Sequence, residues 1–165
     1  MPQDAIDDIL DQWSEERPEL DTAPLGIVVR VMTLYRSFSR DATRALEPLG
    51  LELWEYDVLA ALRRQGKPFT LPATRLARET ELSSGAMTNR IDRLEDRGLV
   101  ARETDKEDRR SILVKLTAEG RKIIDEAISH RLDAARISLG NLKASERREL
   151  ADLLRRVVLS SERGG

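Results

Sequence analysis

The sequence predicts a mainly α protein with a small β component, of the α+β class, and three observations lead to this prediction. Apolar residues recur at helical spacing along most of the chain. Residues 70–98 read as two helices joined by a tight connection, and residues 99–116 read as two short strands around a polar run. A helix pair followed by a β-hairpin is the order of a winged helix-turn-helix lobe, and the other helices predict a second, helical part.

The N-terminal third of the chain is expected to be helical. Residues 4–16 carry an apolar stripe, and residues 25–46, between Pro24 and Pro48, are expected to form a long core helix. A further helix is predicted over residues 53–64. The apolar residues of the first stripe are Ile6, Ile9, Leu10 and Trp13. Those of the long helix are Val28, Val31, Met32, Tyr35, Phe38, Ala42 and Ala45.

Two helices are then predicted in quick succession. The first spans residues 70–80 with Thr70 as its cap, and the connection 81–84 has the length of a helix-turn-helix. The second helix begins at Ser83 or Ser84 and ends at Gly98, with Met87, Ile91 and Leu94 on its inward side. Its outward side suits contact with base edges and phosphates. The candidate DNA-contacting residues there are Ser83, Ser84, Gly85, Thr88, Asn89 and Arg93.

A charged β-hairpin follows the second helix. Residues 99–103 and 111–116 have strand character, the latter through alternating Ile112, Val114 and Leu116. Residues 104–110, TDKEDRR, are too polar to bury. We therefore expect them to project as the hairpin tip.

Two more helices complete the prediction. The first follows Thr117, which can cap it, and reaches Leu139; the second follows Ser145. The last helix carries more apolar surface than a peripheral helix of a small domain needs, which makes it a candidate dimer interface. Its apolar residues are Leu150, Leu153, Leu154, Val157 and Val158. Either terminal helix could instead cap its own chain, and for residues 4–16 the two alternatives are equally favoured.

The charge of the chain is unevenly distributed. The net charge is -2 at pH 7, but residues 1–24 hold eight acidic side chains against one arginine, a net of -7. Residues 62–115 hold thirteen basic and nine acidic side chains, a net of +4. The predicted helix-turn-helix region is thus the basic part, as phosphate contacts require.

Composition disfavours several function classes. The chain has no cysteine and one histidine, His130, so thiolate and multi-histidine metal sites are not expected, nor is a cofactor. No glycine-rich phosphate loop or triad-like arrangement is present, which disfavours an enzyme. No segment approaches about 18 consecutive apolar residues, and the acidic N-terminus is unlike a secretory signal. We expect a cytoplasmic protein with no membrane partner.

Over about residues 25–160 the sequence resembles the MarR family of bacterial transcriptional regulators. The specific feature is a D-x-x-D-R-R-x(5)-L-T pattern after the recognition helix, formed by Asp105, Asp108, Arg109, Arg110, Leu116 and Thr117. The resemblance implies that Arg110 enters the minor groove, that Asp108 steadies it and that Arg109 contacts a phosphate or the groove nearby. A narrow minor groove attracts guanidinium groups, in agreement with these roles.

The resemblance also implies the organisation and partners of the chain. Residues 1–165 would be one domain, with a winged lobe over 51–116 and a helical dimerisation region over 1–50 and 117–165. The expected function is a ligand-responsive DNA-binding regulator, by family habit a repressor. A homodimer would bind double-stranded DNA at a pseudo-palindromic operator. The alternative is a winged helix that binds protein and has no effector ligand.

Four residues suggest an effector site. Arg90 lies about 60° from Met87 on the helix, so it should be partly buried and need a partner, for which Asp57 and Arg102 are candidates. Trp13, Asp57, Arg90 and Arg102 resemble the ligand-binding positions of the urate-responsive subgroup, which also has an added N-terminal helix. The set suits a small aromatic anion such as urate or a phenolic acid. A purely structural ion pair of Asp57 with Arg90 is the alternative.

Overall fold

A computed structural model describes residues 3–105, 108 and 111–164, and divides the chain into two compact units, Met1–Asp41 and Ala42–Gly165. The mainly α class with a small antiparallel sheet is confirmed. The helices are α1 (Ala5–Glu16), α2 (Ala23–Leu46), the 3₁₀ helix η1 (Glu47–Leu49), α3 (Leu53–Arg64), α4 (Ala73–Glu79), α5 (Ser84–Asp96), α6 (Ala118–Ser138) and α7 (Ala144–Gly164). The strands are β1 (Thr70–Pro72), β2 (Val100–Thr104) and β3 (Ile112–Leu116).

In the first unit, α1 packs against the α2 segment of its own chain. Arg30 donates hydrogen bonds to the carboxylates of Asp4 at 2.9 Å and Asp7 at 2.5 Å. A Cβ added to Gly26 would stand 2.6 Å from Leu10 Cδ1, so the two helices approach closely at that point. The acidic N-terminal helix thus has a partner within its own chain.

Helix α2 differs from the expected core helix. Its C-terminal residues Ala42 and Leu46 are buried, but Val28 is 53% and Tyr35 71% exposed. The helical phase of the apolar residues was predicted correctly, while the inference that they lie in the core was wrong for most of the helix. An apolar stripe shows which face seeks a partner and does not show that the partner belongs to the same chain.

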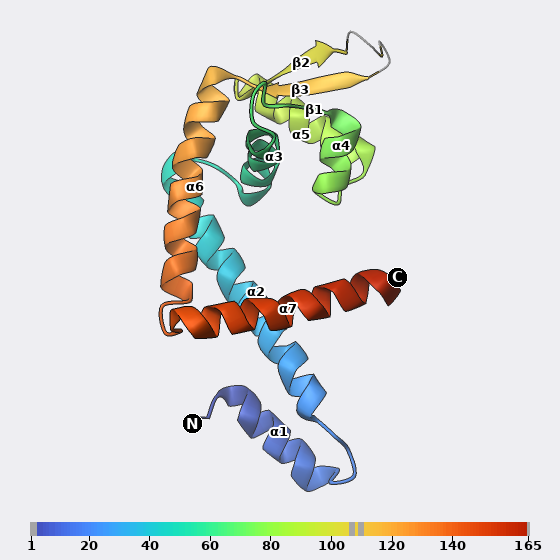
Figure 1. The fold of residues 1–165 in the computed structure, drawn as a ribbon, viewed down its shortest axis with the longest axis vertical. Helices are drawn as coiled ribbons and strands as arrows, with labels where there is room; N and C mark the ends of the chain where they lie inside the picture. Colours follow the sequence, from blue (N-terminus) through green and yellow to red (C-terminus); the bar gives the residue numbers. More distant parts are fainter. Residues whose placement is uncertain (1–2, 106–107, 109–110, 165) are drawn as a thin grey trace. The chain divides into compact units, whose positions relative to one another are not determined.

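The sheet has the order β1-β3-β2 in the described residues, with both pairings antiparallel (Figure 1). Leu71 and Arg102 both lie opposite Val114 in the register. The predicted helix over residues 70–80 is therefore corrected: residues 70–72 form strand β1, and α4 begins only at Ala73. Thr70 pairs with Lys115 in the sheet and does not cap the helix. The extended backbone favoured by Thr70 and the Pro72 ring suits an edge strand.

The helix-turn-helix is present as predicted. Ser83 is the N-cap of α5, and its Oγ accepts the Ala86 N–H at 3.3 Å. The turn from α4 includes Glu81 in a left-handed conformation with φ 55°, and Gly98 after α5 has φ 68°. Figure 1 shows α4 and α5 next to the sheet.

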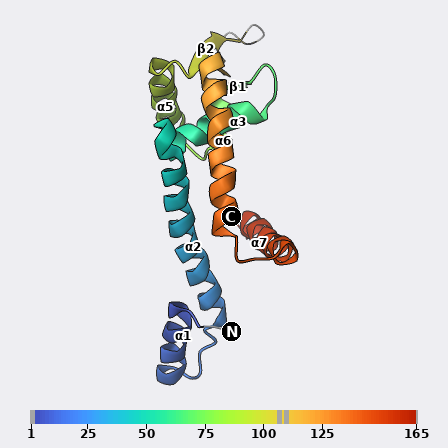
Figure 2. The ribbon, with the colours of Figure 1, turned by 90° about the vertical axis from the view of Figure 1, so that its left-hand side faces the viewer.

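The core lies in the second unit, where α3, α4, α5 and the sheet meet. Met87, Ile91 and Leu94 of α5 and Leu76 and Ala77 of α4 are buried in it, as expected from their spacing. Helix α3 also packs against α6 (Figure 2), and Ile124 and Ala127 of α6 close that side of the core. The outward side of α5 is left free of core contacts.

The start of α6 is fixed to the start of β2. Thr117 caps α6 as predicted, because its Oγ1 accepts the Gly120 N–H at 2.9 Å and donates to Gly98 O at 2.7 Å. A Cβ added to Gly120 would stand 1.9 Å from Leu99 O.

Every side chain of α7 whose burial is described is exposed except that of Leu150, which is half-buried. Within the described residues, no helix has the length and apolarity to cross a bilayer.

Candidate nucleic-acid interface

The outward face of α5 is exposed along its length. Ser83, Ser84, Gly85, Thr88, Asn89 and Arg93 are all exposed. The Thr88 hydroxyl donates to Ser84 O at 3.0 Å, and a Cβ at Gly85 would meet nothing within 4 Å. This leaves room at the N-terminal end of α5 for close approach of a large partner.

Arg93 is held by two residues from the start of α3. Its Nη2 donates to Glu52 Oε1 at 2.7 Å, and its guanidinium lies over the Trp54 ring, 4.7 Å from the centroid. The Trp54 indole N–H donates to Glu52 Oε2 at 2.8 Å, and this bond and the Arg93 contact lower the pKa of Glu52. Sequence reasoning missed Glu52 and Trp54, because they lie about 40 residues from Arg93 and no local periodicity links the two segments.

A second contact with α3 fixes the C-terminal end of α5. Arg97 donates to the buried carboxylate of Glu55 at 2.5 Å and to Gly50 O at 3.1 Å. Glu55 Oε2 also accepts the Glu52 N–H at 2.9 Å. Glu55 is only 1% exposed, so this ion pair is shielded from solvent on the acidic side. The sequence offered no signal for it beyond a glutamate among apolar residues.

Arg102 of β2 joins the hairpin to α5. Its guanidinium donates to Asp92 and Glu95, each at 2.6 Å, and to Thr88 O at 3.3 Å. Both carboxylates help to raise the pKa of Arg102, against the effect of its burial. These contacts couple the orientation of the hairpin to that of α5.

The hairpin tip is described only in part. The Asp105 N–H donates to Ser111 O at 3.1 Å, and the Ser111 N–H donates to Asp108 O at 2.8 Å, so the two strands stay paired up to the tip. Asp108 is exposed there. Arg109 and Arg110, which were predicted to contact DNA, lie outside the described residues.

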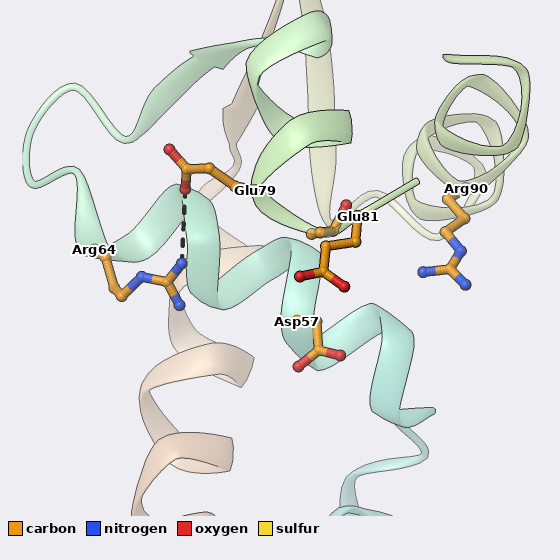
Figure 3. A pocket seen from close by; sticks show the side chains of 6 residues that line it. Asp57, Arg64, Glu79, Glu81 and Arg90 are labelled. Atoms are coloured by element: carbon orange, nitrogen blue, oxygen red, sulfur yellow. Dashed lines mark ion pairs between the residues drawn. The ribbon is translucent and has the colours of Figure 1, made fainter. Parts of the chain in front are cut away.

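A polar pocket of about 260 Å³ lies beside α5 (Figure 3). It is lined by Asp57, Arg64, Glu79, Thr80, Glu81 and Arg90, which come from α3, from the end of α4, from the turn after it and from α5. Arg64 pairs with Glu79 at 3.6 Å across one side. Arg90 is half-buried, as its helical phase predicted, and its guanidinium lies 5.1 Å from the Trp54 ring centroid.

Asp57 has an unusual electrostatic environment. Loss of solvation raises the pKa of its carboxyl group, while the positive charges of Arg131, Arg90 and Arg64 lower it to a smaller extent. Among the described residues it forms no ion pair within 4.0 Å, so the three arginines act on it from a distance. The pocket therefore presents a carboxylate acceptor, Asp57, and a guanidinium donor, Arg90, that form no ion pair with each other.

The four predicted ligand residues are placed differently. Asp57 and Arg90 lie together in the pocket (Figure 3), whereas Arg102 is not among its lining residues and is engaged by Asp92 and Glu95. Trp13 belongs to the first unit, on α1, and is 44% exposed. Within the described residues there is no cluster of histidine and acidic side chains that could hold a metal ion.

Comparison with known proteins decides the family. The model of the MarR family matches residues 49–111, which include α3, β1, α4, α5 and β2. The chain is 30% identical over 152 residues to the transcriptional regulator PecS of Dickeya dadantii, covering 92% of each chain. The chain belongs to the MarR family.

Two further similarities support this assignment. The transcriptional repressor Rv2887 of Mycobacterium tuberculosis is 35% identical over 140 residues, which cover 83% of this chain and 95% of the relative. The structure of a MarR variant from E. coli complexed with operator DNA superposes with a TM-score of 0.71 at 27% identity, covering 88% of this chain and 96% of that one. The relatives of this MarR family member are helix-turn-helix transcriptional regulators and not enzymes.

Proposed function

We propose that this MarR family protein is a ligand-responsive repressor that binds a pseudo-palindromic operator as a homodimer. The observation that carries the proposal is the exposed outward face of α5, with Thr88, Asn89 and Arg93 available beside a charged hairpin. Such a face presents hydroxyl, amide and guanidinium groups, which recognise base edges and phosphates. Several of the relatives, Rv2887 among them, are named transcriptional repressors.

The hairpin supplies the second part of the proposed interface. Arg110 is the residue proposed to enter the minor groove, with Asp108 as its support and Arg109 on a phosphate. Backbone hydrogen bonds pair residues 105, 108 and 111 at the base of this tip, and the Arg102 contacts hold β2 against α5. Reading both grooves at once requires the helix and the hairpin to keep a constant relative orientation.

The homodimer is proposed from the exposed apolar residues of the long helices. Leu153, Val157 and Val158 are 47%, 63% and 53% exposed on one side of α7. Contiguous apolar surface of this kind marks an interaction site, and a second copy is the partner that a two-fold operator requires. Two recognition helices would then meet successive major grooves about one helical turn apart.

Operator binding can be tested by footprinting the DNA that flanks the gene of this protein, followed by titration in gel shifts. We expect a two-fold symmetric footprint and an affinity that falls by on the order of a hundredfold or more between roughly 50 and 200 mM salt. Arg110→Ala should weaken operator binding by about tenfold or more. Arg155→Ala is the matched control, since it removes the same charge from an exposed local pair with Asp152 on α7.

The competing function is a winged helix that binds protein. It predicts no footprint, no salt dependence and equal behaviour of the Arg110→Ala and Arg155→Ala variants. Any specific footprint that disappears in Arg110→Ala and persists in Arg155→Ala excludes it.

The effector is proposed to be a small aromatic anion that binds through Trp13, Asp57, Arg90 and Arg102. Support comes from the pocket, where Asp57 can accept ring N–H groups and Arg90 can donate to an anionic oxygen. Trp13 and Arg102 enter the proposal through the sequence resemblance alone. A ligand that binds the free protein and the DNA-bound protein unequally would shift the equilibrium toward release.

Isothermal titration with urate, xanthine and salicylate tests the effector. We expect at least one of these anions to bind the wild-type protein and to bind the Trp13→Ala, Arg90→Ala double variant much more weakly. Equal binding to both proteins, or no binding by any of the three, contradicts the proposed effector class without affecting the operator experiment.

A further inference from the structure

The start of α3 reaches the recognition helix through one aromatic side chain. Trp54 is half-buried, and the guanidinium groups of Arg90 and Arg93 lie 5.1 Å and 4.7 Å from its ring centroid. The two arginines are three residues apart on α5, so they project from neighbouring positions of one helical surface. A single indole is therefore contacted by two cations from successive turns of α5.

The position of the indole is itself fixed by Glu52. The indole N–H donates to Glu52 Oε2 at 2.8 Å, while Glu52 Oε1 accepts from Arg93 at 2.7 Å. Arg93 is thus held by a ring face and by a carboxylate that is anchored to the same ring. The Glu52 contact engages one amino group of the guanidinium, which has further N–H donors available for a partner.

The exposure of Arg93 and Glu52 shows that their contact leaves Arg93 open to a partner. The Arg93 side chain is 59% exposed and the Glu52 side chain 58%, so Arg93 stays accessible on the outward face while its plane is held from behind. A free arginine loses much rotamer freedom when it is fixed, and a side chain that is already held loses less on binding. Pre-orientation of this kind raises affinity without adding a contact to the DNA.

We propose that Trp54 is a positioning residue for operator recognition, which with Glu52 holds Arg93 in place before DNA is bound. The inference rests on the proposed operator binding of α5. It gives α3 a part in recognition that does not depend on α3 contacting the DNA itself.

The test is a double-mutant cycle on operator affinity with Trp54→Leu, Arg93→Ala and the combined variant. We expect Trp54→Leu to weaken binding by about threefold, because the cation–π contact that holds Arg93 over the ring before DNA is bound is lost. In the Arg93→Ala background the same change should have a much smaller effect, because the contact with Arg93 is already gone. Trp54→Phe should fall between Trp54→Leu and wild type, since it keeps a ring face and loses the N–H.

Tyr56→Leu is the matched control. Tyr56 lies on the same helix, and its ring is covered at 5.5 Å by Arg131 of α6 and not by an arginine of α5. We expect its operator affinity to stay within about twofold of wild type. Circular dichroism and urea unfolding check that each variant is folded, and if Trp54→Leu is not, the cycle is run with Trp54→Phe.

The outcomes separate this inference from the proposed function. If the wild-type protein gives a footprint but Trp54→Leu binds as tightly, or weakens binding equally with and without Arg93, the positioning role is overturned and operator binding stands. The same holds if Arg93→Ala binds like wild type. A wild-type protein that gives no footprint overturns the proposed function and this inference together.

Discussion

The winged lobe differs from helices α2 and α7 in the burial of its apolar side chains. Leu59 and Leu94 of the lobe are 0% exposed, whereas Tyr35 of α2 is 71% and Val157 of α7 is 63% exposed. Both regions show clear helical periodicity in the sequence. The periodicity therefore identifies an apolar face in each case, and only the structure distinguishes a face that is already covered from one that needs a partner.

The difference assigns different sources of stability to the two regions. Burial of apolar area stabilises the lobe within one chain, at about 25 cal/mol per Å² removed from water. The exposed faces of α2 and α7 gain no such stabilisation until another surface covers them. The lobe should thus respond to substitutions through folding, and the helices should respond through assembly.

The largest effect is expected from Gly120→Ala, at the junction of β2 and α6. The new Cβ would stand 1.9 Å from Leu99 O, which is backbone and cannot move aside without displacing the strand. We expect a loss of about 3 kcal/mol or more in the free energy of unfolding, measured by urea denaturation.

Gly85→Ala is the matched control for this substitution. Its Cβ would meet nothing within 4 Å on α5, so helix propensity should raise stability by up to about 1 kcal/mol. A Gly120→Ala protein as stable as wild type would show that the close approach of α6 to β2 is not a constraint.

The second effect concerns assembly. Val157→Glu places a charge on the exposed apolar side of α7, and we expect it to convert a dimer into monomers in analytical ultracentrifugation. Helical content by circular dichroism should stay close to that of wild type, because the Val157 side chain is 63% exposed in the single chain. Arg155→Ala, on the opposite side of α7, should leave the dimer intact. If Val157→Glu remains a dimer, the partner surface of α7 lies elsewhere.

The sequence predicted most of the local structure and much less of what connects it. The α3 bounds, the Ser83 and Thr117 caps and the inward residues of α5 are all as expected, because each depends on neighbours along the chain. Strand β1 was predicted as helix, since its pairing partner lies more than 40 residues away on β3. The same separation hid the contacts of Arg93 with Glu52 and of Arg97 with Glu55.

Only some of the predicted ligand residues lie together in the structure, although all of them match the family pattern. Asp57 and Arg90 both line the pocket; Arg90 was placed by its helix face, and Asp57 was named as its candidate partner and through the resemblance. Arg102 sits on a strand, where it donates to two carboxylates of α5, and it is not among the residues that line the pocket. The part of Arg102 in ligand binding stays a prediction.

The third effect, intermediate in size, concerns the ion pair of Arg97 with Glu55, which joins the end of α5 to α3. Arg97→Ala leaves the buried carboxylate of Glu55 with the Glu52 N–H and without its cation. We expect a loss of about 1–3 kcal/mol in the free energy of unfolding, the range for a buried group deprived of a partner. Arg63→Ala removes a comparable arginine from a more exposed pair with Asp125 and should cost less than about 1 kcal/mol. Equal losses in the two variants would show that burial of Glu55 does not strengthen its dependence on Arg97.

The smallest effect is expected at Asp57, which lines the pocket of the winged lobe. Loss of solvation raises the pKa of this carboxyl group, so the folded protein holds the proton at a pH where the unfolded chain has released it. The ionised form is therefore a cost to folding at neutral pH, and that cost disappears as the pH falls through the raised pKa toward the ordinary value of 3.8. Asp57→Asn should be slightly more stable than wild type at pH 7, by no more than about 1 kcal/mol because solvent screens the site. The difference should shrink at pH 4 in the same urea titrations, and a difference that grows instead would mean that the arginines around Asp57 outweigh its desolvation.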